Sequence, residues 1–141
     1  MAILTARNDG VCRFSATFAK YGKTVETDAT KDHGGEDTSY SPIDLTLAAL
    51  VNCTGTLMAI KARAIGLDPT GMTVSGDYAM VPGRIGSVTM DATIPCAPDE
   101  KGRQGIIRAA NNCPVRKSLH PDIDITLTIN WADGTIETVK E

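Results

Sequence analysis

Several features that would point directly to a function are missing from this 141-residue chain. Its four cysteines form no CxxC pair and neither of its two histidines stands at zinc-finger spacing, so no structural metal site is expected. Lysine and arginine number 14 against 17 acidic residues, for a net charge of −3, and there is no basic run. This balance argues against nucleic acid or an anionic membrane as a partner. No repeat, low-complexity tract or linker marks a second domain, so we expect residues 1–141 to form one domain.

The N-terminal residues, MAILTARNDG, become polar too soon to resemble the apolar part of a secretory signal. We therefore expect a cytoplasmic protein, whose cysteines stay reduced. A chain of this length can bury roughly 68–70% of its unfolded surface without disulfides. In such a compartment a cysteine that matters is more often catalytic than structural.

The longest continuous helical pattern runs from Ser41 to Gly66. Ser41 suits the N-cap, Pro42 suits the first helical position, and Asp44 completes a capping-box pattern. Gly66 can adopt the left-handed conformation that ends a helix. Between these signals apolar and small residues occupy every side, which predicts a helix buried all round.

A membrane-spanning helix is the competing interpretation, because about 20 apolar residues cross a bilayer. Polar residues within the run, among them Asp44 and Asn52, and the lack of a flanking basic loop argue against it. One sheet and one short helix would cover such a helix poorly in a chain of this size. We therefore expect an intimate homodimer that encloses two copies of the helix.

The other patterns predict an α+β protein. Alternating residues predict a hairpin over 11–19 and 23–29, a second over 72–81 and 85–94, and a strand over 123–131 that turns into 135–139. Met80 is expected to face inward. A polar loop, TKDHGGEDTSY, precedes the long helix, and two shorter helices are expected after Asp99 and after Asn112.

Two cysteines stand in positions of chemical interest. Cys53 lies in the middle of the long helix, where burial favours the neutral thiol, so its simplest interpretation is a small core residue. Cys113 begins a short helix, where free N–H groups favour the thiolate, and Arg116 and Lys117 one turn later add to this. The alternative for Cys113 is a cap residue chosen for its size.

Two free cysteines, one of them at a helix start, suit a reaction in which a thiolate attacks a peroxide, becomes a sulfenic acid and is captured by a second thiol. The reaction needs the two sulfur atoms close together, which spacing in the sequence does not establish. Cys12, on the inward face of the first predicted hairpin, and Cys96, beside prolines, are interpreted as structural.

The blocks SPIDLTLAALVNCT and NNCPVRKSL resemble the two signature motifs of the OsmC/Ohr superfamily, and GGEDTSYSP is similar to the lead-in of its OsmC-like branch. The expected order of strands and helices also resembles that family along nearly the whole chain. The resemblance implies an OsmC-like α+β fold, with antiparallel sheets around a long buried central helix. It also implies a domain-swapped homodimer with its active sites at the subunit interface.

The same resemblance implies a thiol-dependent peroxidase that reduces organic hydroperoxides in oxidative stress defence. Cys53 matches the family's peroxidatic cysteine and Cys113 its resolving cysteine; a thiol or dithiol would be the reductant, and no cofactor is implied. Leucine, methionine and isoleucine side chains around the helix would give a pocket that favours alkyl peroxides.

One position departs from the family pattern. The peroxidase members have a glutamate directly after the cap proline, paired with an arginine that activates the thiolate, and this chain has Ile43 there. Asp44 lies about 100° further around the helix and cannot simply replace that glutamate. His33 in the polar loop, and Arg7 and Arg13 in the N-terminal segment, are the candidates for the positive charge.

Two other interpretations stay open. The chain is a binding protein for a small apolar or thiol-bearing ligand with little peroxidase activity, which Ile43 favours, or it is a structural dimer whose cysteines only pack. Whether it is an enzyme depends on Cys53 and Cys113 reacting together.

Overall fold

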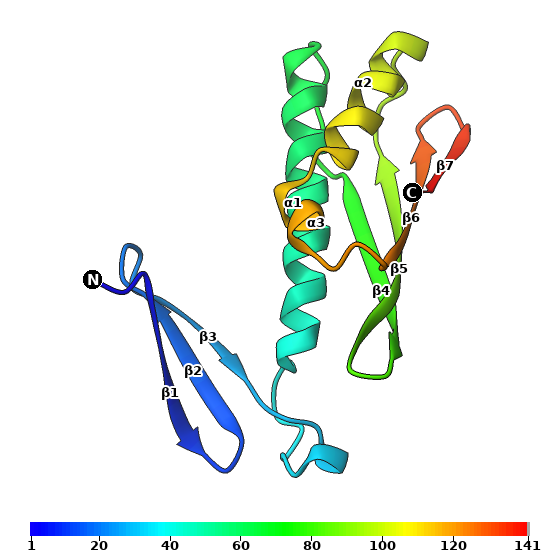
Figure 1. The fold of residues 1–141 in the computed structure, drawn as a ribbon. Helices are drawn as coiled ribbons and strands as arrows, with labels where there is room; N and C mark the ends of the chain where they lie inside the picture. The colour runs from blue at the N-terminus through cyan, green and yellow to red at the C-terminus, as the bar shows by residue number, and fades with distance from the viewer. Residues whose placement is uncertain (141) are drawn as a thin grey trace. The chain divides into compact units, whose positions relative to one another are not determined.

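The computed structural model describes residues 1–140, which form an α+β fold with two separate sheets (Figure 1). The predicted α+β class is therefore confirmed. The chain divides into two compact units, Met1–Thr46 and a second that starts at Leu47. That the whole chain forms one domain stays a prediction.

The first unit contains a three-stranded antiparallel sheet in the order β1–β2–β3. Its strands are β1 (Leu4–Gly10), β2 (Arg13–Phe18) and β3 (Lys23–Thr27). The hairpin of β2 and β3 agrees with the sequence pattern, whereas β1 was not predicted. A strand made mostly of polar residues gives no apolar alternation to detect.

Cys12 does not lie on the inward face of a strand, and that prediction is wrong. It follows Val11, whose φ of 46° is left-handed, in the turn between β1 and β2, and it is exposed. The sequence pattern extends the strand over this turn because Cys12 and Phe14 stand two residues apart, as residues on one face of a strand do.

The polar loop between β3 and the long helix is held by internal contacts around the short 3₁₀ helix η1 (Lys31–His33). Asp28, which is 1% exposed, accepts hydrogen bonds from Thr38 through both its hydroxyl and its backbone N–H. These bonds hold the pKa of Asp28 below its ordinary value. A Cβ at Gly35 would overlap the carbonyl oxygen of Ala29, so the backbone segments pack closely.

The long helix, α1 (Pro42–Ala64), begins in the first unit and continues through the second. At its start the Ser41 N–H donates to the Asp44 carboxylate at 2.9 Å, and the Asp44 N–H donates to the Ser41 hydroxyl at 3.1 Å. This reciprocal pair is a capping box. Gly66 follows the helix with a φ of 81°. The predicted start and end signals are therefore confirmed.

The second unit contains a four-stranded sheet in the order β4–β5–β6–β7. Its strands are β4 (Thr73–Val81), β5 (Arg84–Ile94), β6 (Asp124–Trp131) and β7 (Ile136–Lys140). The expected sheets are antiparallel, but β5 and β6 pair in parallel. The connection between them carries two helices, α2 (Glu100–Asn111) and α3 (Pro114–Ser118), and such a crossover returns the chain in the same direction.

The core of the second unit lies between one face of this sheet and the helices. Alternate residues of β5 and β6 are buried together with single residues from successive turns of α1 and with residues of α2. The strands contribute Val88, Met90, Ala92, Ile94, Ile125, Leu127, Ile129 and Trp131. Met80 is expected to face inward but is 51% exposed, because a register shift between Ala79 and Met80 turns the end of β4.

Within one chain α1 is not buried all round, and burial on every side stays a prediction that depends on the expected second copy. Its buried residues are Leu50, Thr54, Met58 and Ala62, one for each turn, whereas Ile60 is 59% exposed. By length and composition α1 could cross a membrane, which is weak evidence because core helices of soluble proteins pass the same test. The opposite side of α1 is therefore a surface that the other described elements of the second unit leave uncovered.

Candidate active site

The candidate site is set by the way in which α2 packs against α1. A Cβ at Gly105 of α2 would stand 2.7 Å from Cε of Lys61 on α1, so the two helices are in contact there (Figure 1). Cys53 lies about two turns before Lys61 on α1, and Cys113 lies about two turns after Gly105, just past the end of α2. Because α1 and α2 run antiparallel, the same spacing from this contact brings Cys53 and Cys113 to the same end of the helix pair.

Cys113 is the N-cap of α3, at the start of the short helix that the sequence predicts. Its backbone is extended (φ −63°, ψ 121°), and its sulfur accepts a hydrogen bond from the Arg116 N–H at 3.4 Å. Pro114 follows at the first helical position, where no N–H is needed. The side chain of Cys113 is fully buried, so it is held in one place.

The two asparagines before Cys113 fix the turn between α2 and α3. The Arg116 guanidinium donates to the Asn111 side-chain oxygen at 3.2 Å, and the Lys117 ammonium contacts the Asn112 side-chain oxygen. Asn112 is also the C-cap of α2. The motif NNCPVRK therefore forms a turn that is held by hydrogen bonds between its own residues, and this turn fixes the position of the Cys113 sulfur.

Cys53 is half-buried on α1, and burial raises the pKa of its thiol. A side-chain hydrogen bond with Cys113 raises it further, which places the two thiols in contact. The backbone N–H of Val115, in the first turn of α3, lowers the pKa of Cys53 by donating to its sulfur. The structure thus brings together the two cysteines singled out in the sequence.

The hydrogen bond from Val115 to Cys53 is a contact that the sequence did not predict. The signal was present, because a Cys-Pro helix start leaves the N–H groups of the first turn without helical partners. Which sulfur receives them depends on the packing of α1, which is not visible in the local sequence.

Ile43 provides no carboxylate at the position where the peroxidase members have a glutamate. Ile43 is half-buried in the first turn of α1, and the carboxylate of its neighbour Asp44 accepts the Ser41 N–H of the capping box. Asp44 therefore has a structural role at the helix start.

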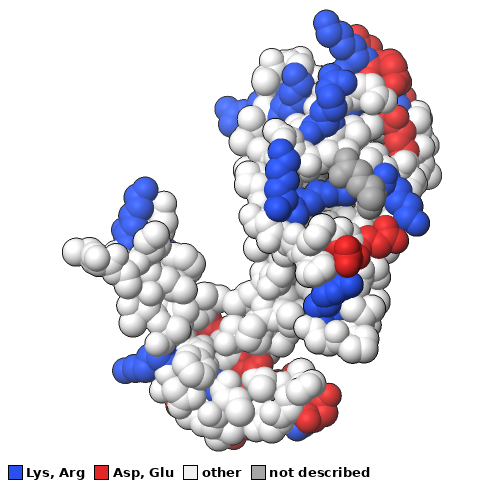
Figure 2. Space-filling view, in the orientation of Figure 1, with Lys and Arg blue, Asp and Glu red and all other residues white. Residues whose placement is uncertain are grey.

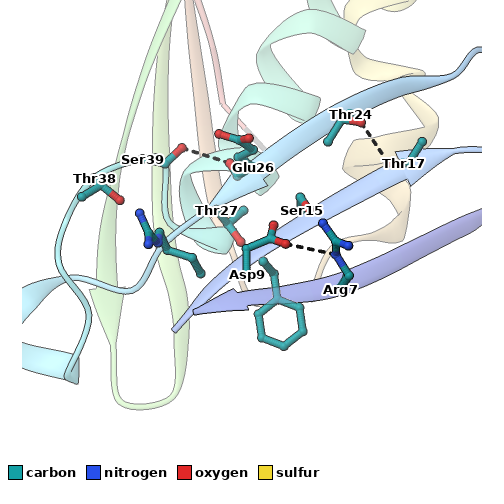
Figure 3. Close-up of a pocket in the computed structure, with 11 residues that line it drawn as sticks. Arg7, Asp9, Ser15, Thr17, Thr24, Glu26, Thr27, Thr38 and Ser39 are labelled. Atoms are coloured by element: carbon teal, nitrogen blue, oxygen red, sulfur yellow. Dashed lines mark hydrogen bonds and ion pairs between the residues drawn. The ribbon is translucent and has the colours of Figure 1, made fainter. Parts of the chain in front are cut away.

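Arg7 and Arg13 line a cavity of about 650 Å³ on the sheet of the first unit (Figure 3). Nε of Arg7 donates to Asp9 at 3.1 Å, and the Arg7 side chain is 81% exposed. Arg13 lies 4.0 Å from the carboxylate of Glu36. Both guanidinium groups are thus paired with acidic side chains of their own unit.

His33 belongs to η1 in the same unit. Its Nδ1 shares a hydrogen bond with the Thr30 hydroxyl at 2.9 Å and lies 3.6 Å from the Asp32 carboxylate. The His33 side chain is largely exposed. An activating role for any of these three cations stays a prediction.

The remaining cysteines lie apart from this pair. The Cys12 thiol donates to the Gly34 carbonyl at 3.7 Å, and Cys96 is half-buried. Burial raises the pKa of Cys96, and the nearby charge of Asp68 adds to the effect. Among residues 1–140 no three or more His, Cys, Asp and Glu side chains gather in a way that could hold a metal ion.

Comparison with known proteins identifies relatives of this chain. The family model for OsmC-like protein matches residues 33–128. A structure from Psychrobacter arcticus, described as a putative osmotic stress induced and detoxification response protein, is 32% identical with a TM-score of 0.85, covering 92% of this chain and 96% of that one. No curated protein matches.

Two more distant structures share the fold. An organic hydroperoxide resistance protein from Vibrio cholerae, described as putative and with captopril bound in one of its active sites, is 19% identical with a TM-score of 0.72, covering 97% of this chain and 95% of that one. Organic hydroperoxide resistance protein OhrB from Bacillus subtilis is 20% identical with a TM-score of 0.66, covering 92% and 97%.

Proposed function

The chain belongs to the OsmC-like protein family, and from this premise we propose that it is a thiol-dependent peroxidase that reduces organic hydroperoxides. Two solved structures of the same fold are those of organic hydroperoxide resistance proteins. The observation that carries the proposal is the contact between the thiols of Cys53 and Cys113.

In the first step of the proposed reaction the thiolate of Cys53 attacks the terminal oxygen of the hydroperoxide. The O–O bond breaks, the alkoxide leaves and takes up a proton to become an alcohol, and Cys53 becomes a sulfenic acid. The Val115 N–H supports this step, because a hydrogen bond to the sulfur favours its charged form.

In the second step the thiol of Cys113 attacks the sulfenic sulfur of Cys53. A disulfide forms, and the sulfenic oxygen leaves as water. An external dithiol then reduces the disulfide by thiol–disulfide exchange and is itself oxidised to a disulfide. The burial of Cys113 beside Cys53 supports this assignment, because a resolving thiol must reach the peroxidatic sulfur before solvent oxidants do.

The test is consumption of cumene hydroperoxide by the purified protein with dithiothreitol as reductant. We expect turnover by the wild type and loss of turnover in Cys53→Ser. In Cys113→Ser treated with peroxide in the absence of dithiothreitol, we expect a sulfenic acid that persists on Cys53. Cys12→Ser and Cys96→Ser are matched controls that keep activity, since neither sulfur touches the pair.

Intact mass after one equivalent of peroxide gives an independent readout. The wild type should lose two hydrogens, and peptide mapping should join residue 53 to residue 113. A wild type that consumes peroxide no faster than Cys53→Ser would refute the enzyme assignment.

Arg7, Arg13 and His33 are proposed as the candidates for the positive charge that stabilises the Cys53 thiolate. The single variants Arg7→Met, Arg13→Met and His33→Gln identify which candidate is the activating cation. Loss of that cation should slow the attack of Cys53 on the peroxide and leave the rate of disulfide reduction unchanged. Lys23→Met, on β3 of the same sheet, is the control for a general change of charge.

A second function is favoured by one specific observation. Ile43 stands where the peroxidase members have a glutamate, and Asp44 is engaged in the helix cap, so a binding protein for a small apolar or thiol-bearing ligand is the alternative. The Vibrio cholerae structure contains a bound small molecule, captopril, in an active site. Ligand binding without peroxide turnover would decide for this alternative.

We further propose that the protein is a domain-swapped homodimer of the cytoplasm, with its active sites at the subunit interface. The support is the uncovered side of α1, which is long, apolar and in part exposed in the single chain. Burial of that side against a second copy would remove apolar surface from water. A soluble dimer accounts for α1 without a membrane.

A further inference from the structure

A second cavity lies in the second unit, which also contains Cys53 and Cys113, at the end of the α1–α2 contact away from the two cysteines. It measures about 490 Å³, within the range of about 300–1,000 Å³ for small-molecule sites. Part of it is an apolar wall made of Ile65, Leu67 and Pro98. Cys53 and Cys113 are not among the residues that line it.

The cavity has a cationic rim formed by Lys61, Lys101 and Arg108. Figure 2 shows Lys and Arg side chains gathered over this region, where α1 ends and α2 begins. Among the residues that the structure describes, none of these three cations has an ion-pair partner. Three positive charges therefore face one cavity.

The single acidic residue of the lining offsets one of the three positive charges and leaves two. Asp99 is the N-cap of α2, and its carboxylate accepts the Gly102 N–H at 2.8 Å. That hydrogen bond satisfies an otherwise free N–H group at the helix start. The rim thus keeps a net positive charge.

Two glycines of α2 shape the floor of the cavity. A Cβ at Gly102 would stand 2.7 Å from Pro98 and 3.1 Å from Ile65, and one at Gly105 would stand 2.7 Å from the Lys61 side chain. Glycine within a helix costs roughly 0.5–1 kcal/mol relative to alanine. Here it lets the helices approach so that the stem of Lys61 lies along α2, with its ammonium group at the cavity.

From this arrangement we propose that the cavity binds organic anions in which a carboxylate is joined to a short apolar chain. The carboxylate meets the cationic rim, where lysine and arginine donate charge-assisted hydrogen bonds. The chain lies against the apolar wall, which excludes water from it. Neither inorganic anions, which lack the chain, nor neutral alcohols, which lack the charge, use both parts of the site.

The experiment titrates octanoate into the reduced wild-type protein and measures heat of binding. Octanol and inorganic phosphate are the comparison ligands. We expect octanoate to bind with a Kd of about 1 mM or tighter, and each comparison ligand to bind at least about 10-fold more weakly. Octanol that binds as well as octanoate would overturn the proposal.

The double variant Lys61→Met/Arg108→Met removes two rim charges and keeps the aliphatic length of both side chains. Octanoate affinity should fall at least about 10-fold. The matched control, Lys20→Met/Arg63→Met, removes two charges away from the cavity and should stay within about twofold of the wild type. Equal loss in both double variants would show a general charge effect and refute the site.

Lys101→Met provides a second route, since this side chain is exposed and its replacement leaves the core untouched. This variant should bind octanoate more weakly than the wild type, and its thermal unfolding should match that of the wild type. Octanoate binding should also persist in Cys53→Ser and in a protein that shows no peroxidase turnover, so failure of the proposed function would leave this proposal standing.

Discussion

At the scale of single residues, the ionisation of Cys53 limits what the site can do. Burial and the Cys113 thiol both raise its pKa, so at neutral pH less of it is thiolate than of an ordinary cysteine. The rate of alkylation by iodoacetamide in a Cys12→Ser/Cys96→Ser background should rise with pH and reach half its maximum above the ordinary thiol range. Cys113→Ala should shift this profile to lower pH, and an unchanged profile would contradict the thiol contact.

A backbone position in the loop before α1 gives a second prediction at this scale. Gly35→Ala should destabilise the protein by about 3 kcal/mol, because the new Cβ overlaps the Ala29 carbonyl and backbone must shift. Gly34→Ala is the matched control. Gly34 has a φ of 84° and open space around it, so only strain of about 1 kcal/mol is expected. Urea unfolding of both variants measures the difference, and equal losses would contradict the packing argument.

Single residues with local partners could be predicted from the sequence, and those with distant partners could not. The cap role of Ser41 and the place of Cys113 at a helix start follow from spacing within one turn and agree with the structure. The contact between Cys53 and Cys113 depends on how α2 packs on α1, which local sequence does not reveal. The two cysteines were paired only through the resemblance to a family. Cys12 was misplaced because a turn residue happened to fit a strand alternation.

At the scale of elements, Arg103 joins α2 to the turn between β6 and β7. Its guanidinium lies 2.6 Å from the Asp133 carboxylate and over the Trp131 ring, 5.2 Å from the centroid. Backbone hydrogen bonding from Thr135, and then the Arg103 contact, lower the pKa of Asp133 from 3.8 to about 2. A carboxylate with a lowered pKa stabilises the fold above its ordinary pKa and loses that contribution as pH falls towards about 2.

Arg103→Met should therefore lower the thermal midpoint most at neutral pH, with a difference from the wild type that shrinks between pH 3.8 and about 2. Melting curves at several pH values measure this. Arg108→Met, on the same helix but without an ion pair in the described part of the chain, should show no such pH dependence. A constant difference across pH would contradict the ion-pair explanation.

Elements with an apolar alternation were the ones that the sequence predicted. β5 and β6 bury alternate residues and lie where the pattern indicates. β1 is largely polar and exposed, so it gave no signal. The parallel pairing of β5 with β6 also escaped prediction, since alternation is the same for either direction of a neighbouring strand.

At the scale of the whole molecule, the uncovered side of α1 predicts the oligomeric state. The proposed homodimer should sediment at twice the mass of one chain. Ile60→Glu, at a position 59% exposed in one chain, should disrupt it because a carboxylate would be buried between copies. Ile136→Glu on β7, 64% exposed, is the matched control and should remain dimeric. A monomeric wild type would refute the dimer proposal.

The sulfur of Cys113 holds the start of α3 by accepting the Arg116 N–H. Once the proposed disulfide forms, that sulfur carries less negative charge and accepts the bond more weakly. Oxidation would then fray the short helix beside the bond, and fraying would admit the reducing agent to an otherwise covered linkage. Amide hydrogen exchange at Arg116 should therefore be faster in the oxidised protein. The exchange rate of this one backbone amide would then report whether the cysteine pair is reduced or oxidised.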